Sequence, residues 1–258
     1  MSFDFTDKTI LLTGATRGIG RELTKLLIAR GAYVLAVSRD EKALEDLAAT
    51  APSQIAYLAA DLEDPTMPRA IANWVNAEHP ECCGLINNAA IMVHTDLTAP
   101  PHDRTEELAQ EIAINLTSPM ALCTALLPTL SRNGPGLIAN VTSGLALTPL
   151  PDAAGYCASK AGLRSFTKAL RYQCEDTGFD LQVSEVLMTL VDTNLSHGDP
   201  AKKLSPAEAA TDMITGLEAG TREIAINKVR LLKILVRFAP WLADRIIRGP
   251  RPKATPAE

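Results

Sequence analysis

Short apolar runs and helix-like segments alternate through most of the chain, and this alternation is the feature that most limits the possible folds. Seven runs rich in aliphatic and β-branched residues have the length of strands: 9–13, 33–38, 55–60, 85–87, 137–142, 181–187 and 223–226. The segments between them repeat apolar residues with helical spacing: 19–30, 41–51, 68–78, 106–131, 155–177 and 206–219. Buried strands joined by crossover helices predict an α/β fold with a doubly wound parallel sheet of about seven strands.

A glycine-rich turn follows the first predicted strand and opens the first predicted helix. It reads TGATRGIG over residues 13–20. Glycine lets the backbone turn sharply and approach a pyrophosphate closely, and the helix that follows offers free N–H groups and the positive end of its dipole. We therefore predict a dinucleotide-binding turn; the alternative is a tight turn that binds nothing.

The composition excludes several classes of protein. With 47% hydrophobic and 21% charged residues, the chain does not have the composition of a disordered, collagen-like or coiled-coil protein. Its five cysteines show no paired CxxC spacing and no accompanying His cluster, so we expect no disulfide framework, no metal site and a reducing, cytoplasmic location. No uninterrupted apolar run reaches the length of a membrane span, so none is predicted.

The net charge of −5 is unevenly distributed. From residue 228 to the end there are eight Lys or Arg against two acidic residues, a net charge of +6, so the rest of the chain carries −11. The negative net charge of residues 1–227 does not attract nucleic acid electrostatically, so we expect no nucleic-acid partner. The basic carboxyl-terminal segment needs a separate explanation.

That segment has the pattern of an amphipathic helix pair. Leu231, Leu235, Phe238 and Leu242 follow one helical stripe, and Pro240 separates two predicted helices. We favour a stripe that covers the subunit's own pocket or a neighbouring subunit, because most amphipathic helices of globular proteins bury their apolar side. The alternative is contact with a membrane surface, where the Lys and Arg residues would be attracted to anionic lipid.

Tyr156 and Lys160 stand one turn apart on a predicted helix, so their side chains leave the same face. A positive charge about 4 Å from a phenol contributes ~4 kcal/mol at an effective dielectric constant of about 20, enough to lower the phenol pKa by about 3 units.

Ser143 ends the fifth predicted strand, at the edge where such sheets bind ligands. Asn115 lies inside a predicted helix, where an amide is a poor helix former. Singly, each residue has an ordinary alternative on a helix face, in a turn or at a cap.

Together, and in this order behind the glycine-rich turn, these residues resemble the short-chain dehydrogenase/reductase family, from Lys8 to about residue 226. Within it, the chain looks like a subgroup labelled after a teichoic-acid D-alanylation protein. The resemblance implies a single-domain Rossmann fold and hydride transfer between a nicotinamide cofactor and a carbonyl or alcohol. It also implies Tyr156 as acid/base, Lys160 as its electrostatic partner, Ser143 as the ligand of the substrate oxygen and Asn115 as the anchor of a relay water.

The family's cofactor contacts can be carried over position by position. The resemblance implies this set: Gly14, Thr16, Arg17, Gly18, Ile19, Gly20, Ser38, Arg39, Asp61, Leu62, Asn88, Ala89, Ala90, Tyr156, Lys160, Val191 and Thr193. Two departures occur. Ala90 replaces the usual glycine, which we expect to matter little, and Met188 and Thr189 replace the usual Pro-Gly, which leaves the shape of that loop open.

The end of the second predicted strand bears on the choice of cofactor. Ser38 stands where family members that use NAD carry Asp, and Arg39 follows it. A guanidinium group matches a phosphate bidentately, and Arg17 could supply a second cation. We therefore predict NADP(H). NAD(H) stays open if Arg39 is only solvated and Asp40 is an N-cap or a ribose ligand.

The remaining expectations concern partners and organisation. Three loops that follow predicted strands should line the substrate pocket: 91–104, 144–154 and 188–204. They carry little charge to bind an anion, which favours a small, mainly apolar carbonyl or alcohol substrate. The helices over 106–131 and 155–177 pair across a twofold axis in the family, which implies a homodimer or homotetramer. We divide the chain into a dinucleotide-binding and catalytic domain (1–227), a basic helical extension (228–248) and a disordered tail (249–258). A nucleotide-binding regulator without turnover and a scaffold at a membrane surface are the competing functions.

Overall fold

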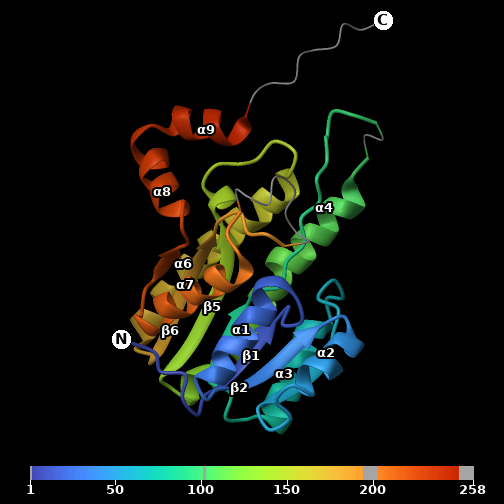
Figure 1. Cartoon of the computed structure of the whole chain (residues 1–258), viewed down its shortest axis with the longest axis vertical. Helices are drawn as coiled ribbons and strands as arrows, with labels where there is room; N and C mark the ends of the chain where they lie inside the picture. Colours follow the sequence, from blue (N-terminus) through green and yellow to red (C-terminus); the bar gives the residue numbers. More distant parts are fainter. Residues whose placement is uncertain (1, 101–102, 194–202, 250–258) are drawn as a thin grey trace, which may run out of the picture.

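The computed structural model describes residues 2–100, 103–193 and 203–249, and these form one parallel sheet covered by helices (Figure 1). The strand order is β3-β2-β1-β4-β5-β6-β7. The strands are β1 (Thr9–Thr13), β2 (Tyr33–Ser38), β3 (Ile55–Ala59), β4 (Gly84–Asn87), β5 (Gly136–Ser143), β6 (Leu181–Met188) and β7 (Glu223–Ala225). All seven predicted strands are present. Because β1 pairs with both β2 and β4, the strand order reverses at β1, which is where parallel sheets of this kind bind ligands.

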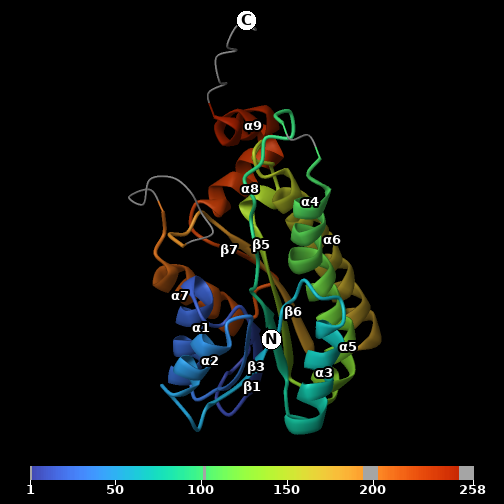
Figure 2. The ribbon, with the colours of Figure 1, turned by 90° about the vertical axis from the view of Figure 1, so that its right-hand side faces the viewer.

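Helices lie on both faces of the sheet (Figure 2). One face is covered by α1 (Gly18–Ala29), α2 (Glu41–Ala48) and α7 (Pro206–Glu218). The other is covered by α3 (Met67–Glu78), α5 (Ser118–Arg132) and α6 (Ala154–Thr177). The predicted doubly wound parallel sheet is therefore confirmed.

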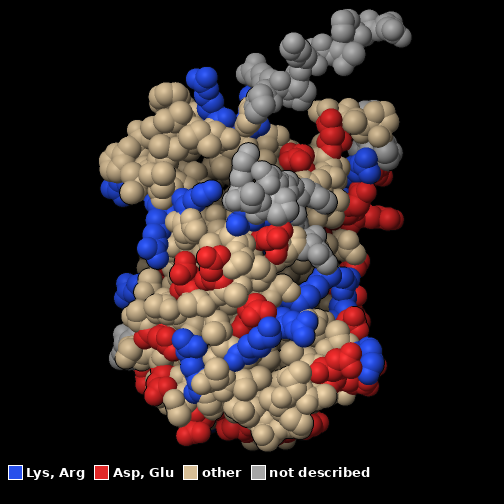
Figure 3. All heavy atoms as spheres, in the orientation of Figure 1, with Lys and Arg blue, Asp and Glu red and all other residues tan. Residues whose placement is uncertain are grey.

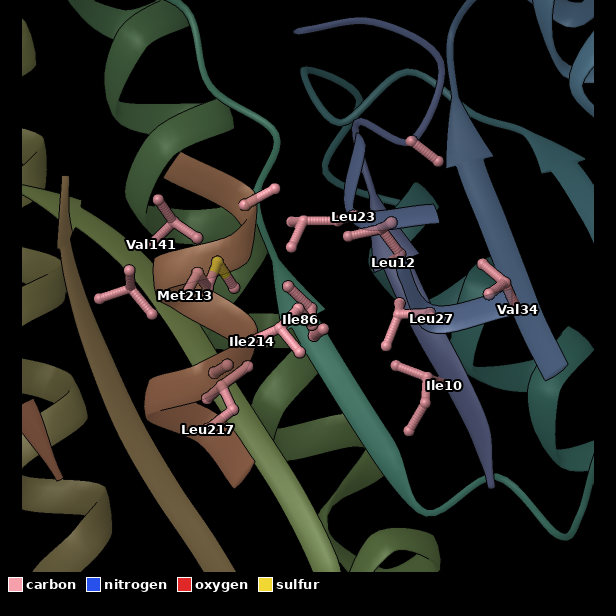
Figure 4. Close-up of a cluster of buried hydrophobic side chains, with 14 of the residues drawn as sticks. Ile10, Leu12, Leu23, Leu27, Val34, Ile86, Val141, Met213, Ile214 and Leu217 are labelled. Atoms are coloured by element: carbon pink, nitrogen blue, oxygen red, sulfur yellow. The ribbon is translucent and has the colours of Figure 1, made fainter. Parts of the chain in front are cut away.

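The core beneath α1 and α7 shows why these segments are helical (Figure 4). Leu23 and Leu27, one turn apart on α1, and Met213 and Leu217, one turn apart on α7, are fully buried together with Ile10 of β1. Each such aliphatic side chain contributes about 1.5–3 kcal/mol when it is removed from water. Burial of one stripe of each helix therefore fixes both helices on the sheet.

The helix predicted over residues 106–131 is not continuous, which corrects the sequence interpretation. It consists of α4 (Thr105–Ile112), a π-helical turn η1 (Ala113–Thr117) and α5. Pro119 has no N–H group and cannot donate the α-helical hydrogen bond to the carbonyl of Asn115, four residues before it. The helix therefore widens at Asn115, as π-helical turns often do at functional positions.

The same region, Thr105–Arg132, is the one described segment that is long and apolar enough to cross a membrane by length and composition, and an 18-residue window within it has a mean hydropathy of 1.4. Polar residues such as Asn115, Ser118 and Thr124 interrupt the apolar run, so a test for uninterrupted apolar runs does not find it. In the structure it contributes Leu122, Leu126 and Leu130 to the core on the second face of the sheet. Burial against the sheet accounts for part of its apolar composition, since 44% of that window is buried.

Two short helices, α8 (Val229–Phe238) and α9 (Pro240–Arg248), follow β7 and lie at one end of the long axis of the molecule (Figure 1). Pro240 occupies the first turn of α9. The stripe predicted from the sequence is divided, because Leu235 is half-buried whereas Leu231 and Phe238 are exposed. Residues 250–258, which contain most of the predicted disordered tail, lie outside the described residues.

Contacts with the body of the protein hold these two helices. The Cδ2 atom of Leu232 lies 3.2 Å from the point that a Cβ on Gly144 would occupy, directly after β5. Lys233 forms an ion pair with Glu223 of β7 at 2.6 Å. On α9, Asp244 accepts a hydrogen bond from Thr148 at 2.7 Å. The inner faces of α8 and α9 thus cover the segment that follows Ser143.

Candidate active site

The glycine-rich turn brings the carboxyl ends of β1 and β4 into close contact. Gly14 has a φ of +68°, and a Cβ there would lie 2.9 Å from the Cα of Ala89. A Cβ on Gly20 would collide with the carbonyl oxygen of Gly14. The hydroxyl of Thr13 accepts hydrogen bonds from the backbone N–H groups of Asn88 and Ala89, both at 3.1 Å. Glycine is therefore required at both positions for this backbone path.

The amino terminus of α1 opens onto this turn. Arg17 is the N-cap residue in an extended conformation, and within the described part of the chain its side chain does not cap the helix. Gly18 follows with a φ of +52°, and a Cβ there would lie 3.1 Å from Cγ2 of Thr193. The first N–H groups of α1 thus lie between the β1 turn and the loop after β6, the arrangement that binds phosphate groups.

A cleft of about 760 Å³ runs across the carboxyl ends of β1, β2 and β4. This volume lies within the range of small-molecule sites, about 300–1,000 Å³. Most of the predicted cofactor residues line it: Gly14, Thr16, Arg17, Gly18, Ile19, Gly20, Ser38, Arg39, Asp61, Leu62, Asn88, Ala89, Ala90 and Thr193. Residues that the sequence interpretation did not assign also line it: Val37, Ala43, Ala60, Ile91, Ile114 and Asp192. Among the described residues, the lining does not include Val191, Tyr156 or Lys160.

The rim of the cleft at the end of β2 carries the residues predicted to distinguish the two nicotinamide cofactors. The Ser38 and Thr16 hydroxyl groups are 3.0 Å apart. The half-exposed Arg39 side chain lies 3.8 Å from the carboxylate of Asp61. Asp40, the alternative ribose ligand, accepts a hydrogen bond from the Ala43 N–H at 3.0 Å and so caps α2. The Arg39 guanidinium is therefore a cation at the end of β2, with the Asp61 carboxylate beside it.

Ser143, Tyr156 and Lys160 are buried at the carboxyl end of β5 and in the first turns of α6. Burial raises the pKa of Tyr156 to about 12, although hydrogen bonding with the Ser143 side chain lowers it in part. Lys160 Nζ lies 5.8 Å from the centre of the Tyr156 ring and donates a hydrogen bond to the carbonyl of Val141 at 2.8 Å. Burial lowers the pKa of Lys160 to about 7. In the protein alone, burial therefore outweighs the lowering of the phenol pKa that the sequence predicts from the lysine charge.

The Asn115 side chain connects three parts of the site. Its oxygen accepts from the Ile91 N–H at 2.9 Å, and its nitrogen donates to the Ile91 carbonyl at 2.8 Å and to the Ser159 hydroxyl at 3.2 Å. Ile91 lines the cleft, and Ser159 precedes Lys160 on α6. The amide thus joins the cleft to the helix that carries Tyr156 and Lys160. Both hydrogens of the amide are used in these bonds, so a water held by this residue would have to donate to one of its oxygens.

Glu111 is a buried site residue that the sequence interpretation missed. One of its carboxylate oxygens accepts a hydrogen bond from the Val93 N–H at 2.8 Å. The other lies where a Cβ on Gly155 would stand, at the beginning of α6. Burial raises the pKa of Glu111, and hydrogen bonding with the Tyr156 backbone N–H lowers it in part. Its position four residues before Asn115, on the same side of a helix, was the signal that could have identified it.

Apolar side chains surround the tyrosine. Met92, Leu145 and Leu150 pack against Tyr156 and Cys157. These side chains come from the loops after β4 and β5, two of the three loops predicted to line a substrate pocket. All five cysteines of the chain are buried free thiols.

A parallel sheet with a glycine-lined cleft at the reversal of its strand order, beside a buried Ser–Tyr–Lys group, defines a dinucleotide-binding protein of the Rossmann class. The sequence profile of the short chain dehydrogenases matches residues 8–203. The chain belongs to this family of oxidoreductases.

Individual relatives agree with that assignment. The chain is 34% identical over 241 residues to a protein of Bacillus subtilis (strain 168) named "Uncharacterized oxidoreductase DltE", and the match covers 90% of this chain and 93% of the relative. It is 31% identical to the L-xylulose reductase of Caenorhabditis elegans, over 78% and 80% of the two chains. A crystal structure of a short chain dehydrogenase from Burkholderia cenocepacia J2315 in complex with NADP has a TM-score of 0.84 and 26% identity, covering 96% of this chain and 100% of the other.

Proposed function

We propose that this protein is an NADP(H)-dependent oxidoreductase that interconverts a carbonyl compound and an alcohol through Ser143, Tyr156, Lys160 and Asn115. The observation that carries the proposal is the burial of Ser143 and Tyr156 against one another at the carboxyl end of β5, on the same sheet edge as the glycine-lined cleft. The close approach of Gly14 to Ala89 and the open amino terminus of α1 fit the pyrophosphate of a dinucleotide.

When bound, the nicotinamide cofactor supplies or accepts the hydride. Among the residues of the chain, the Ser143 hydroxyl orients the substrate oxygen, and the Tyr156 hydroxyl gives a proton to that oxygen or takes one from it. Lys160 acts on Tyr156 through its charge, so its protonated form must be favoured during turnover. Asn115 and Glu111 position the loops after β4 and the beginning of α6 around these two residues.

The preference for NADP(H) rests on the rim at the end of β2. Arg39 lies beside the cleft, Arg17 also lines it, and Ser38 replaces the acidic residue that would accept a ribose hydroxyl. A 2′-phosphate would be attracted to both guanidinium groups. The Burkholderia cenocepacia structure with 26% identity contains NADP, which supports the same preference.

The apolar side chains around Tyr156 and the two long helices bear on the substrate and the assembly. Met92, Leu145 and Leu150 beside Tyr156 favour a mainly apolar substrate. We also infer a homodimer or homotetramer in which α5 and α6 pair across a twofold axis, and a reducing, cytoplasmic location for its five unpaired thiols. Residues 1–227 would form the dinucleotide-binding and catalytic domain, and residues 228–248 would form a helical extension of that domain.

The test is the replacement Tyr156→Phe, assayed by NADPH absorbance against a panel of aldehydes and ketones. The variant should lose turnover by at least about a hundredfold, because a positioned acid/base contributes roughly 10²–10⁴ in rate. Its NADPH affinity, measured by titration, should stay within about threefold of the wild type. The control is Tyr172→Phe, which changes an exposed tyrosine on the same helix.

The outcomes separate the competing functions. Turnover by the wild type and by Tyr172→Phe, but not by Tyr156→Phe, supports the proposal. Full turnover by Tyr156→Phe would remove Tyr156 from the mechanism. NADPH binding without turnover of any carbonyl compound in either control protein would favour a nucleotide-binding regulator.

A further inference from the structure

The two carboxyl-terminal helices expose a group of large apolar side chains. Five of them are 57–76% exposed: Leu231, Ile234, Phe238, Trp241 and Ile246. Single exposed apolar residues are ordinary on protein surfaces, whereas such a group on two successive helices marks an interaction surface. We call these five side chains the outer face.

The outer face is distinct from the surface that holds the helices in place. On α8 the exposed residues Leu231, Ile234 and Phe238 are spaced by three and four positions and lie on one side. Val229, which is buried, and Leu232, which packs over Gly144, lie on the opposite side. The contact with the catalytic body therefore leaves the outer face uncovered within the described chain.

Basic residues border the outer face on both helices. Arg230 and Arg237 lie along one edge of the exposed apolar side of α8, and Arg245 and Arg248 share the exposed side of α9 with Trp241. The space-filling view shows Lys and Arg around a mostly uncharged surface over these helices (Figure 3). Between residues 228 and 248 the sequence has six Lys or Arg and one acidic residue, a net charge of +5, so the rest of the chain carries −10.

We propose that the outer face docks on the surface of an anionic phospholipid bilayer. Trp and Phe side chains are suited to the boundary between headgroups and acyl chains, and guanidinium groups bind phosphates. Because α8 and α9 lie at one end of the long axis, both can meet a flat surface without obstruction by the sheet (Figure 1). The acidic body is repelled by the same surface, so the charge distribution also orients the protein.

A second copy of the chain fits this face less well. A twofold contact would place the arginines of α8 and α9 against the same arginines of the partner, which is repulsive. A contact between the outer face and the acidic body of another copy would be heterologous, and it would generate a ring or an open filament rather than the twofold dimer inferred above. An anionic bilayer satisfies both the apolar side chains and the cations.

Cosedimentation of the full chain with vesicles tests the proposal. Vesicles of phosphatidylglycerol mixed with phosphatidylcholine should retain the protein at low salt, and vesicles of phosphatidylcholine alone should retain about tenfold less. Added salt should weaken the retention, because it screens the arginine charges. Two double variants test the cations and the aromatic rings separately: Arg237→Glu with Arg245→Glu, and Phe238→Ser with Trp241→Ser. Each double variant should lower the partition coefficient about tenfold. All four positions are exposed, so these variants should fold.

Matched controls lie elsewhere on the surface. Arg69→Glu on α3 removes an exposed cation, and Phe179→Ser before β6 removes an exposed aromatic ring; both should bind vesicles as the wild type does. The chain has two tryptophans, Trp74 and Trp241, so Trp74→Phe leaves Trp241 as the only reporter. Brominated lipids in the anionic vesicles should quench its fluorescence.

Three results would overturn the proposal. The first is no retention by anionic vesicles at low salt. The second is equal retention of the outer-face variants and the two controls, or a Trp241 signal that brominated lipid leaves unchanged. The third is a lower molar mass of the outer-face variants in light scattering, which would make the face a contact between subunits. These readouts do not require turnover, so their failure is distinguishable from failure of the proposed enzymatic function.

Discussion

Replacing Lys160 by Met should make the folded protein more stable near pH 7 while it removes the partner of Tyr156. The lysine is buried, its hydrogen-bond partner within the described residues is the Val141 carbonyl at 2.8 Å, and burial lowers its pKa to about 7. In the unfolded chain a lysine has a pKa of about 10.4. The difference opposes folding by about 4 kcal/mol at pH 7. Loss of the hydrogen bond to Val141 costs about 1–3 kcal/mol, so the net gain is ~1–3 kcal/mol.

The pH dependence identifies the cause of this gain. Between about pH 7 and pH 10 the unfolded chain holds a proton on Lys160 that the folded protein lacks, so the free energy of unfolding rises with pH. Over the interval from about pH 7 to pH 8.5 the rise due to this residue is ~1.7 kcal/mol. In the same interval the buried cysteines oppose this rise, because burial raises their pKa values and the unfolded chain, whose thiols have pKa values of about 8.5, loses thiol protons first. The cysteines are the same in the wild type and in Lys160→Met, so the difference between the two proteins isolates the contribution of the lysine.

Urea unfolding followed by circular dichroism, at about pH 7 and about pH 8.5 and at one protein concentration, measures this difference. The wild type should gain about 1.7 kcal/mol more than Lys160→Met across the interval. Lys168→Met is the matched control, since Lys168 is an exposed lysine on the same helix, and it should keep the wild-type slope. Equal slopes for the wild type and Lys160→Met would refute the reasoning, because they would mean that the folded protein keeps Lys160 protonated.

Three further substitutions probe the cofactor cleft and its support. Gly20→Ala should lower the free energy of unfolding by about 1–3 kcal/mol and weaken NADPH binding, because the added Cβ meets the Gly14 carbonyl. Wild-type values in urea unfolding and in NADPH titration would contradict this packing. Arg39→Asp should lower the preference for NADPH over NADH by at least about tenfold in parallel titrations, whereas an unchanged ratio would exclude Arg39 from phosphate recognition. Glu111→Gln should lower the free energy of unfolding by about 1–2 kcal/mol, because an amide N–H then faces the backbone N–H of Tyr156; a neutral result would show that the carboxylate is not needed there.

The strands and the cofactor cleft could be predicted from the sequence because both depend on local patterns. A parallel strand buried on both faces is apolar at nearly every position, so its bounds are visible in one dimension. The turn at Gly14 and Gly20 is fixed by backbone geometry that other residues cannot adopt, and its place between β1 and α1 puts it at the sheet edge. Residues that follow β2, β3 and β4 then reach the same cleft because parallel strands end together.

Other features depend on contacts between distant segments. Glu111 reads as one more acid on an amphipathic helix until Gly155, from another helix, is placed against it. The helix interruption at Asn115 had a local signal in Pro119, four residues later, but proline is also common in the first turn of helices such as α5. On α8 the apolar residues surround most of the helix, so only the contact between Leu232 and Gly144 shows which side is covered.

The ionisable residues of the site are held by the backbone rather than by opposite charges. Lys160 donates to the carbonyl of Val141, two residues before Ser143, and Glu111 accepts from the N–H groups of Val93 and Tyr156. The Lys160 hydrogen bond therefore joins α6 to β5, and the Glu111 hydrogen bonds join α4 to the loop after β4 and to the beginning of α6. An ion pair between Lys160 and a carboxylate would stabilise the fold more, but it would hold the lysine charge away from Tyr156. The lowered pKa and the stability lost at Lys160 thus both follow from burying an amine beside Tyr156 without a carboxylate partner.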